Sequence, residues 1–202
     1  MVIGVDIDGV LAELNKYTWH YFRKFLKEKN IPYKFDKTKE YFYMQMNVSP
    51  EVENEFWERN VFHYAKHGKM MNNADKYMEK LHNDGHRVVI ITSRRYSDFQ
   101  DERGENMRKA VVQWLAKNHI YYDKICFSNE KTGKKALVIN EKVDIMIDDS
   151  PRNINEISNV VPVLVFKNPA NRICKGDNKL LVNSWKDIYK YISNISKNKK
   201  NQ

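Results

Sequence analysis

Short apolar runs that alternate with helical patterning constrain the fold of this chain most strongly. Each run spans four to six residues, the length of a buried β-strand. The runs are Val2–Val5, Val88–Ile91, Lys124–Phe127, Val143–Ile147 and Val161–Phe166. The intervals between the last four carry helical spacing of apolar residues. Strands that alternate with helices predict an α/β fold: a Rossmann-like, doubly wound parallel sheet of about five strands, with right-handed crossovers.

The segment 14–71 interrupts this alternation. It has no convincing β run, it holds many of the aromatic residues, and it is helical in pattern at Asn15–Lys29 and Pro50–Arg59. Ser49 and Pro50 have the residue types favoured at a helix N-cap and first turn. We therefore expect a core formed by residues 1–13 and 72–202, and a helical cap formed by residues 14–71. A cap inserted there would lie over the carboxyl end of the first strand.

Two aspartates, Asp6 and Asp8, follow the first apolar run, and Gly9 follows them directly. Residues two apart on a strand point to the same face. Carboxylates held that close repel one another unless a cation lies between them. Oxygen ligands favour Mg²⁺. Because ligands of open α/β sheets bind at the carboxyl ends of the strands, this pattern predicts a metal site at that edge.

Three further polar groups fall on the same predicted edge. Thr92-Ser93 closes the second run, where hydroxyls and backbone N–H groups could hold phosphate oxygens. Asp148-Asp149 closes the fourth. A lysine near the start of the preceding helix would supply a point positive charge for a phosphate. The candidates for that lysine are Lys131, Lys134 and Lys135, and we choose Lys134, which directly follows Gly133.

Together these groups supply what phosphoryl transfer requires. One carboxylate can attack phosphorus and form an acyl phosphate. A second can protonate the leaving oxygen and then deprotonate the water that resolves the intermediate. A metal ion and a lysine can neutralise charge on the transferring group. Each piece alone is weak, but four pieces in this order and strand context would rarely coincide.

The chain resembles the haloacid dehalogenase superfamily of phosphohydrolases. Asp6–Glu13 resembles its first motif, Ile90–Ser93 its second, Lys134 its third and Ile147–Ser150 its fourth. The first motif, Asp-Ile-Asp-Gly-Val-Leu-Ala-Glu, is most similar to that of the 5′(3′)-deoxyribonucleotidases and the nucleotidases related to them. The resemblance extends from Met1 to about Phe166.

The resemblance implies a role for each acidic residue. Asp6 would be the nucleophile and Asp8 the general acid/base. Mg²⁺ would be held by the Asp6 carboxylate, the Asp8 backbone carbonyl and an aspartate of the pair Asp148 and Asp149. Asp149 would act either as a direct ligand or through water.

The resemblance also implies that Thr92 and Lys134 hold the phosphate, with assistance from Ser93. One departure follows Ser93: the deoxyribonucleotidases have a proline there, whereas this chain has Arg94 and Arg95. Solvated surface is the favoured interpretation of these two arginines.

We expect a Mg²⁺-dependent phosphoric monoester hydrolase that cleaves a nucleoside 5′-monophosphate through an aspartyl-phosphate. Two alternatives stay open: a sugar-phosphate or nucleic-acid-end phosphatase on the same scaffold, and a non-catalytic module that binds nucleic acid or protein. The net charge of +9 suits anionic partners, but no zinc-finger spacing or arginine-rich stripe favours nucleic acid. No apolar stretch approaches the ~20 residues of a membrane span, and we expect a cytoplasmic protein. The sequence leaves the base, the sugar and homo-oligomer formation undetermined.

Overall fold

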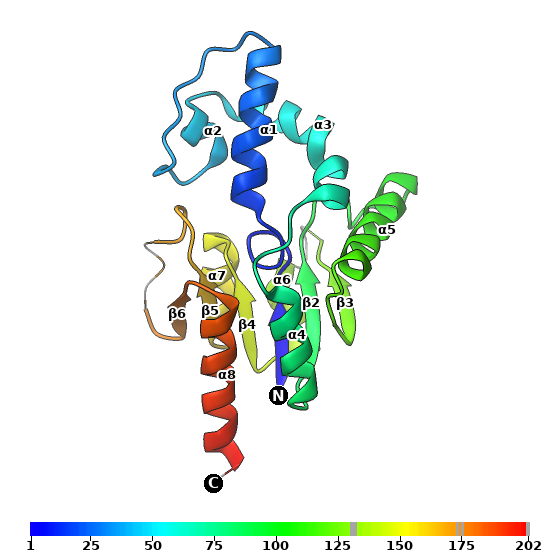
Figure 1. Ribbon diagram of the computed structural model, residues 1–202, viewed down its shortest axis with the longest axis vertical. Helices are drawn as coiled ribbons and strands as arrows, with labels where there is room; N and C mark the ends of the chain where they lie inside the picture. The colour runs from blue at the N-terminus through cyan, green and yellow to red at the C-terminus, as the bar shows by residue number, and fades with distance from the viewer. Residues whose placement is uncertain (130–132, 173, 175, 201–202) are drawn as a thin grey trace.

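Parallel β-strands form the centre of the molecule (Figure 1). The computed structural model describes residues 1–129, 133–172, 174 and 176–200, and within them the sheet has six strands in the order β3-β2-β1-β4-β5-β6. They are β1 (Val2–Val5), β2 (Arg87–Thr92), β3 (Lys124–Phe127), β4 (Ile145–Asp148), β5 (Val163–Phe166) and β6 (Lys179–Val182). The predicted α/β class and parallel sheet are confirmed. The direction of the strand order reverses between β1 and β4, and ligands of such sheets bind at this kind of reversal.

Strand β6 is the one addition to the predicted sheet of about five strands. It pairs in parallel with β5, from Val163 with Lys179 to Phe166 with Val182, and forms the edge of the sheet. Its four residues begin with a lysine, and Leu180 is 41% exposed. Its sequence, Lys-Leu-Leu-Val, has the same pattern as that of β3, Lys-Ile-Cys-Phe, and was overlooked in the prediction.

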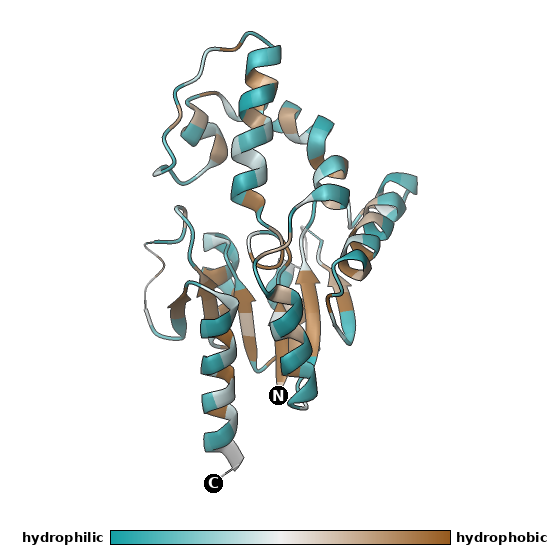
Figure 2. Ribbon diagram, in the orientation of Figure 1, coloured by the Kyte–Doolittle hydropathy of each residue, from teal (hydrophilic) through white to brown (hydrophobic). Residues whose placement is uncertain are grey.

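Helices cover both faces of the sheet, as a doubly wound fold requires. Val88 and Ile90 of β2 pack in one hydrophobic cluster, which includes residues of α4, α5 and α8. Val89 and Ile91 pack in a second cluster with residues of α6 and α7. Figure 2 shows the apolar strands between helices whose outer surfaces are hydrophilic. These helices are α4 (Ala74–Asn83), α5 (Glu102–Lys117), α6 (Gly133–Asn140), α7 (Pro151–Ile157) and α8 (Trp185–Lys200).

Three helices of the segment 14–71 lie beyond the carboxyl ends of the strands (Figure 1). They are α1 (Leu14–Glu28), α2 (Phe42–Met46) and α3 (Pro50–His67). Aromatic rings join α1 to α3, since the ring centroids of Phe22 and Phe56 are 4.7 Å apart, as are those of Tyr17 and Tyr64. This placement is the one that a cap over the first strand needs, and the division into core and cap stays a proposal.

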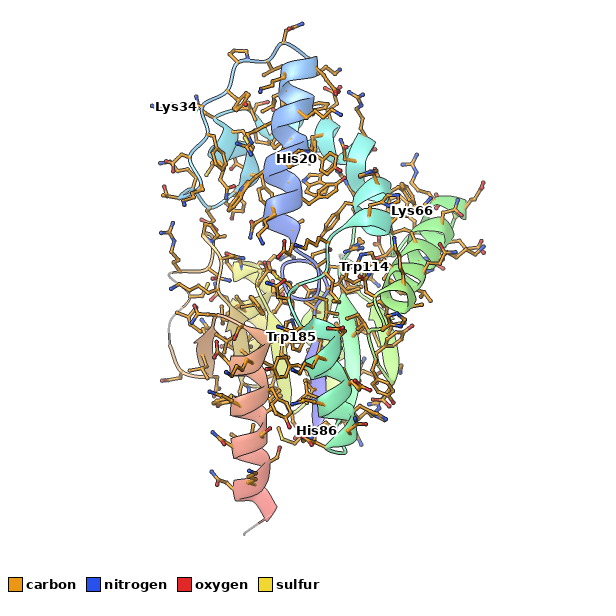
Figure 3. The ribbon with its side chains drawn as sticks, viewed as in Figure 1. His20, Lys34, Lys66, His86, Trp114 and Trp185 are labelled. Atoms are coloured by element: carbon orange, nitrogen blue, oxygen red, sulfur yellow. The ribbon has the colours of Figure 1, made fainter. Side chains whose placement is uncertain are left out.

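Two tryptophans fix the places where the chain leaves and re-enters the core (Figure 3). Trp185 of α8 donates its indole N–H to the carbonyl of Val10, 3.0 Å away, in the loop after β1. Trp114 of α5 donates to the carbonyl of Gly68, 2.6 Å away, just after α3. Both indoles are buried, and a buried indole N–H needs such a partner. The loop that carries Asp6 and Asp8 is therefore held on a rigid frame.

Candidate active site

The pairing of β1 with β4 brings Asp6 and Asp148 together. Val5 aligns with Ile147, so the residues that follow them meet at the carboxyl edge of the sheet. The backbone N–H of Asp6 donates to the carbonyl of Ile147 at 3.0 Å. Asp149 completes the group: one carboxylate oxygen from each of the three aspartates lies within 4.8 Å of the other two. All three side chains are buried.

Lys134 of α6 is the cation that the structure brings to this cluster. Its Nζ lies 2.7 Å from Asp6 Oδ1 and 2.8 Å from Asp148 Oδ2, and its side chain is 2% exposed. Burial alone would lower the pKa of Lys134, but Asp148 and Asp6 raise it above its ordinary value. Of the other two candidates, Lys135 is half-buried on the same helix, and Lys131 lies outside the described residues.

Three buried carboxylates against one lysine leave an excess of negative charge. Burial raises the pKa of Asp6 to about 7, with Lys134 opposing the shift and Asp148 and Asp8 adding to it. Burial, Asp148 and Asp6 raise the pKa of Asp149 well above its usual range. A bound divalent cation would remove this repulsion, and clustered carboxylate oxygens are the ligands that hard cations take. The acidic cluster of Asp6, Asp148 and Asp149 can therefore hold a metal ion.

The two aspartates after β4 differ in how far their oxygens are already engaged. Asp148 accepts hydrogen bonds from Lys134 and, at 3.2 Å, from the side-chain amide of Asn153. Asp149 Oδ2 accepts from Asn168 at 2.8 Å, and Asp149 lines the cavity above the cluster. Sequence reasoning missed both asparagines. The available signal was position: each follows the end of a strand at the edge where the acidic residues lie.

Gly9 allows the loop after β1 to pass directly over Asp149. Its φ is +77°, and a Cβ at this position would lie 1.8 Å from Asp149 Oδ2. Both the left-handed backbone and the close approach require glycine. The glycine that follows Asp8 in the sequence is thus part of how the acidic cluster is built.

Asp8 lies apart from the acidic cluster and reaches into the cavity. Its side chain is 25% exposed, and both of its oxygens accept from Arg94: Oδ2 from Nε at 3.2 Å, and Oδ1 from an Nη. The Arg94 side chain is only 3% exposed. The expectation of solvated surface is wrong for Arg94, because the carboxylate of Asp8 compensates its buried charge, a contact that sequence spacing does not reveal. Arg95 is 35% exposed and points toward α3, where Glu58 lies 3.6 Å away.

The predicted phosphate ligands at the end of β2 differ in their surroundings. Thr92 is fully buried, and its hydroxyl has no hydrogen-bond partner within the described part of the chain. Ser93 is exposed, lines the cavity and shares a hydrogen bond with the hydroxyl of Ser128 in the loop after β3. Ser128 was not anticipated, although it too follows a strand at this edge.

Two cavities meet above the strand ends. The larger has a volume of about 730 Å³ and is lined by Asp6, Lys134 and Asp149 among others. The smaller, of about 290 Å³, has a mainly apolar wall. Residues of α2 and α3 with one residue at the start of α1 form that wall: Leu14, Phe42, Trp57, Val61 and Tyr64. Asp8, Ser93, Arg94 and Arg95 line both cavities.

In the described residues, every helix is too short or too polar to cross a membrane.

A family model described as "5' nucleotidase, deoxy (Pyrimidine), cytosolic type C protein" matches residues 1–199. A protein of Chlorobaculum tepidum named "Putative 5'(3')-deoxyribonucleotidase" is 32% identical over 120 residues, which cover 59% of this chain and 53% of that relative. The match thus spans about half the length of this relative. A nucleotidase of Clostridium acetobutylicum is 24% identical over 199 residues, which cover 96% of this chain and 94% of the relative.

Solved structures share the architecture. A haloacid dehalogenase-like hydrolase from Streptococcus pneumoniae has a TM-score of 0.63 at 14% identity, with 95% of this chain and 98% of that chain covered. A protein from Clostridium acetobutylicum described as a predicted phosphatase has a TM-score of 0.64 at 14% identity, with 96% and 98% covered. At such identities the likeness shows the fold alone.

Proposed function

Because the chain belongs to the family of cytosolic type C deoxy (pyrimidine) 5′-nucleotidases, which are phosphoric monoester hydrolases of the haloacid dehalogenase superfamily, we propose that it hydrolyses a nucleoside 5′-monophosphate. The superfamily resemblance of the four motifs is thereby confirmed. The proposal includes Mg²⁺ as the cofactor and an aspartyl-phosphate on Asp6 as the intermediate. It also includes a cytoplasmic location, which the cytosolic description of the family supports.

One observation carries the proposal: the two carboxylates of a single loop have different surroundings. Asp6 is buried against Lys134 and within the acidic cluster. Asp8 projects into the space between the two cavities. The first environment suits a nucleophile that faces a phosphate held beside a cation, and the second suits a group that exchanges protons with a leaving oxygen or with water.

The reaction then proceeds in two steps. An Asp6 oxygen attacks phosphorus, the bond from phosphorus to the ester oxygen breaks, and Asp8 gives its proton to that oxygen. Asp8 next takes a proton from a water molecule as the water oxygen attacks phosphorus. The bond between phosphorus and Asp6 breaks, which releases phosphate and restores the carboxylate. Asp8 ends the cycle protonated, as it began.

Three groups of the chain are placed to hold the phosphate. Lys134 supplies a buried positive charge next to Asp6. Ser93 presents a hydroxyl to the cavity, and the unpartnered hydroxyl of Thr92 lies at the preceding residue. A buried hydroxyl without a partner costs free energy, about 1–3 kcal/mol, which a bound phosphate oxygen could recover.

The residues of the acidic cluster fit a divalent cation. Mg²⁺ would be held by the carboxylates of Asp6 and Asp149 and by the backbone carbonyl of Asp8, with Asp148 engaged by Lys134 and Asn153. Bound there, it would supply positive charge against the transferring phosphoryl group. Removal of divalent cations with EDTA should abolish activity, and Mg²⁺ should restore it.

The smaller cavity supports a nucleoside as the leaving group. Trp57 and Phe42 give it aromatic surface, and Val61 adds an aliphatic wall. Every nucleobase has a π-face and can stack on such a wall. Stacking contributes about 1–3 kcal/mol of binding free energy per base. A monophosphate whose phosphate lies by Lys134 could reach this wall, because the two cavities share lining residues.

The direct test is phosphate release from a panel of esters with Mg²⁺ present. The panel contains nucleoside 5′-monophosphates, sugar phosphates and a 3′-phosphorylated oligonucleotide, and Asp6→Asn serves as the inactive control. The proposal predicts the highest kcat/KM for a nucleoside 5′-monophosphate. Preference for a sugar phosphate or for the oligonucleotide would replace this substrate by one of the two alternatives named from the sequence.

A further inference from the structure

We propose that Arg94 is a positioning residue for the acid/base carboxylate of Asp8, and that Tyr64 of α3 holds Arg94 in place. The inference rests on the proposed function and deepens it. It assigns a task to the arginine that stands where the related deoxyribonucleotidases have a proline. It also makes proton transfer at Asp8 depend on a residue of the segment 14–71.

The first observation is the burial of Arg94. A guanidinium removed from water costs several kcal/mol unless a carboxylate or other acceptors compensate it. The Arg94 side chain is 3% exposed, and its guanidinium donates a hydrogen bond to each carboxylate oxygen of Asp8. A planar fork that grips both oxygens fixes the plane of the carboxylate as well as its position.

The second observation concerns the flat face of the Arg94 guanidinium, which the hydrogen bonds to Asp8 do not cover. The Tyr64 ring covers it, with Arg94 Cζ 4.9 Å from the ring centroid. Such a cation–π contact is stronger where water is excluded, and Tyr64 is buried. The Tyr64 hydroxyl is buried, and Tyr64 is one of the residues that line the smaller cavity. Arg94 is therefore held between a carboxylate of the core and a ring of α3.

The third observation is where this group sits relative to a substrate. Asp8 and Arg94 line both the cavity beside Lys134 and the apolar cavity. A nucleoside monophosphate with its phosphate in the first and its base in the second would place its ester oxygen between them. The bond from phosphorus to that oxygen breaks as the Asp6 oxygen binds phosphorus, and the proton on Asp8 passes to the oxygen. With the proton on one carboxyl oxygen, the other can still accept from Arg94.

The test compares two esters that differ in their need for a proton on the leaving oxygen. A nucleoside 5′-monophosphate releases an alkoxide that must be protonated, whereas p-nitrophenyl phosphate releases a stable phenolate. The ratio kcat/KM reports on steps up to departure of the leaving group, so hydrolysis of the intermediate does not affect it. We expect Arg94→Met to lower kcat/KM about 100-fold for the nucleotide, the scale of general acid catalysis, and less than about fivefold for the aryl ester.

Matched variants separate positioning from a general loss of charge or fold. Arg87→Met removes an arginine at the opposite end of β2, outside both cavities, and should leave the ratio of the two esters unchanged. Arg94→Lys keeps the positive charge but loses the planar, two-pronged guanidinium. It should still lower kcat/KM selectively for the nucleotide, though by less than Arg94→Met does. Tyr64→Leu should lower kcat/KM about tenfold, relative to the aryl ester, for a sugar phosphate as well as for the nucleotide, because both alkyl esters need the proton and the sugar phosphate has no base that could lose contact with Tyr64. Tyr64→Phe keeps the ring and should keep the ratio of the two esters close to that of the wild type.

If Arg94→Met lowered kcat/KM by the same factor for both esters, the positioning role of Arg94 would be overturned. If Tyr64→Leu kept the wild-type ratio of kcat/KM for the two esters, the role of Tyr64 on α3 would be overturned. A wild-type protein that cleaves neither ester would contradict the proposed function instead. In that case a double-mutant cycle decides the inference. The thermal midpoints of Asp8→Asn, Arg94→Met and the double variant should be non-additive, and additive shifts would overturn the coupling of the two residues.

Discussion

The edge of the sheet and the helices above it contribute to the site in different ways. The edge contributes charge, because Asp6, Asp148 and Lys134 are buried together. Asp6 follows β1, Asp148 ends β4 and Lys134 lies in the first turn of α6. The helices contribute apolar and aromatic surface, with Trp57 and Tyr64 in the wall of the smaller cavity. Pairing of β1 with β4 fixes the positions of Asp6 and Asp148. The positions of the apolar groups depend on how rings pack, as between Phe22 and Phe56.

Because the two regions supply different groups, we expect the edge of the sheet and the helices above it to control different properties of the enzyme. Groups at the strand ends should govern whether the chemistry occurs and whether the cluster is stable without metal. Groups on α2 and α3 should govern which ester is used and how well the leaving oxygen is protonated. Four substitutions test this division, and their expected effects on activity or stability decrease in the order given.

Asp6→Asn should have the largest effect. The amide cannot form the acyl phosphate, so we expect kcat/KM to fall by roughly 10⁴-fold or more, the scale seen when a nucleophile is removed. The measurement is phosphate release with a nucleoside monophosphate. Glu79→Gln, on the exposed surface of α4, is the control and should stay active. If Asp6→Asn kept its activity, the acidic cluster would not take part in the reaction.

Lys134→Met should have the largest effect on stability. It leaves the buried carboxylates of Asp6 and Asp148 without their cation, and breaking a buried pair costs about 3–5 kcal/mol. Urea unfolding in EDTA measures the loss, and Mg²⁺ should recover part of it. Lys135→Met, one residue further along α6, should unfold close to the wild type. A Lys134→Met loss no larger than that of the control would show that the carboxylates do not depend on Lys134.

Gly9→Ala should disturb the strand-end cluster by displacing Asp149. The left-handed backbone adds strain of about 1–3 kcal/mol, and the new methyl overlaps Asp149 Oδ2. We expect lower stability together with a higher Mg²⁺ concentration for half-maximal activity. Gly85→Ala is the matched control, because Gly85 also has positive φ, +83°, but open space around a Cβ. An unchanged Mg²⁺ requirement in Gly9→Ala would show that the displacement does not reach the metal site.

Trp57→Ala should have the smallest effect on activity, and this effect should fall on substrate choice. It should also lower stability, because the Trp57 ring packs against those of Phe56 and Tyr64. Loss of stacking surface is expected to raise KM for a nucleoside monophosphate about tenfold, within the range for one stacked base. KM for a sugar phosphate should change much less. Trp57→Phe retains an aromatic face, so its KM for the nucleoside monophosphate should lie between those of the wild type and Trp57→Ala. An equal rise in KM for both substrates would mean that this wall does not contact the base.

The sequence was most informative where chemistry and strand ends coincide. The bounds of β1 and β3 are those predicted, Asp6 follows β1 as expected, and Asp148 is the last residue of β4. Short runs of Val and Ile in a parallel sheet are recognisable without tertiary information. The contact between Arg94 and Asp8 was not predictable, since it joins residues 86 positions apart through the space above the sheet.

The sequence was least informative for elements whose order comes from packing. Helix α3 continues to His67, beyond the predicted end at Arg59, and Val61, Tyr64 and Ala65 in that extension are buried. Local spacing alone does not show that these turns have a surface to pack on. Strand β6 is a different case, because its apolar residues Leu180–Val182 match the pattern of β3 and the signal was present in the sequence.

The central claim is that Asp6 and Asp8, although two residues apart, have separate roles. Asp8→Asn tests it most directly when mixed with p-nitrophenyl phosphate, because this ester can phosphorylate Asp6 without an acid. The variant then lacks the base that activates water, so mass spectrometry of the N-terminal peptide should find a phosphoryl group on residue 6. Asp6→Asn treated in the same way should carry none. A phosphoryl group on Asp8 in Asp6→Asn, or no trapped phosphoryl group in Asp8→Asn that still cleaves the ester, would contradict the account.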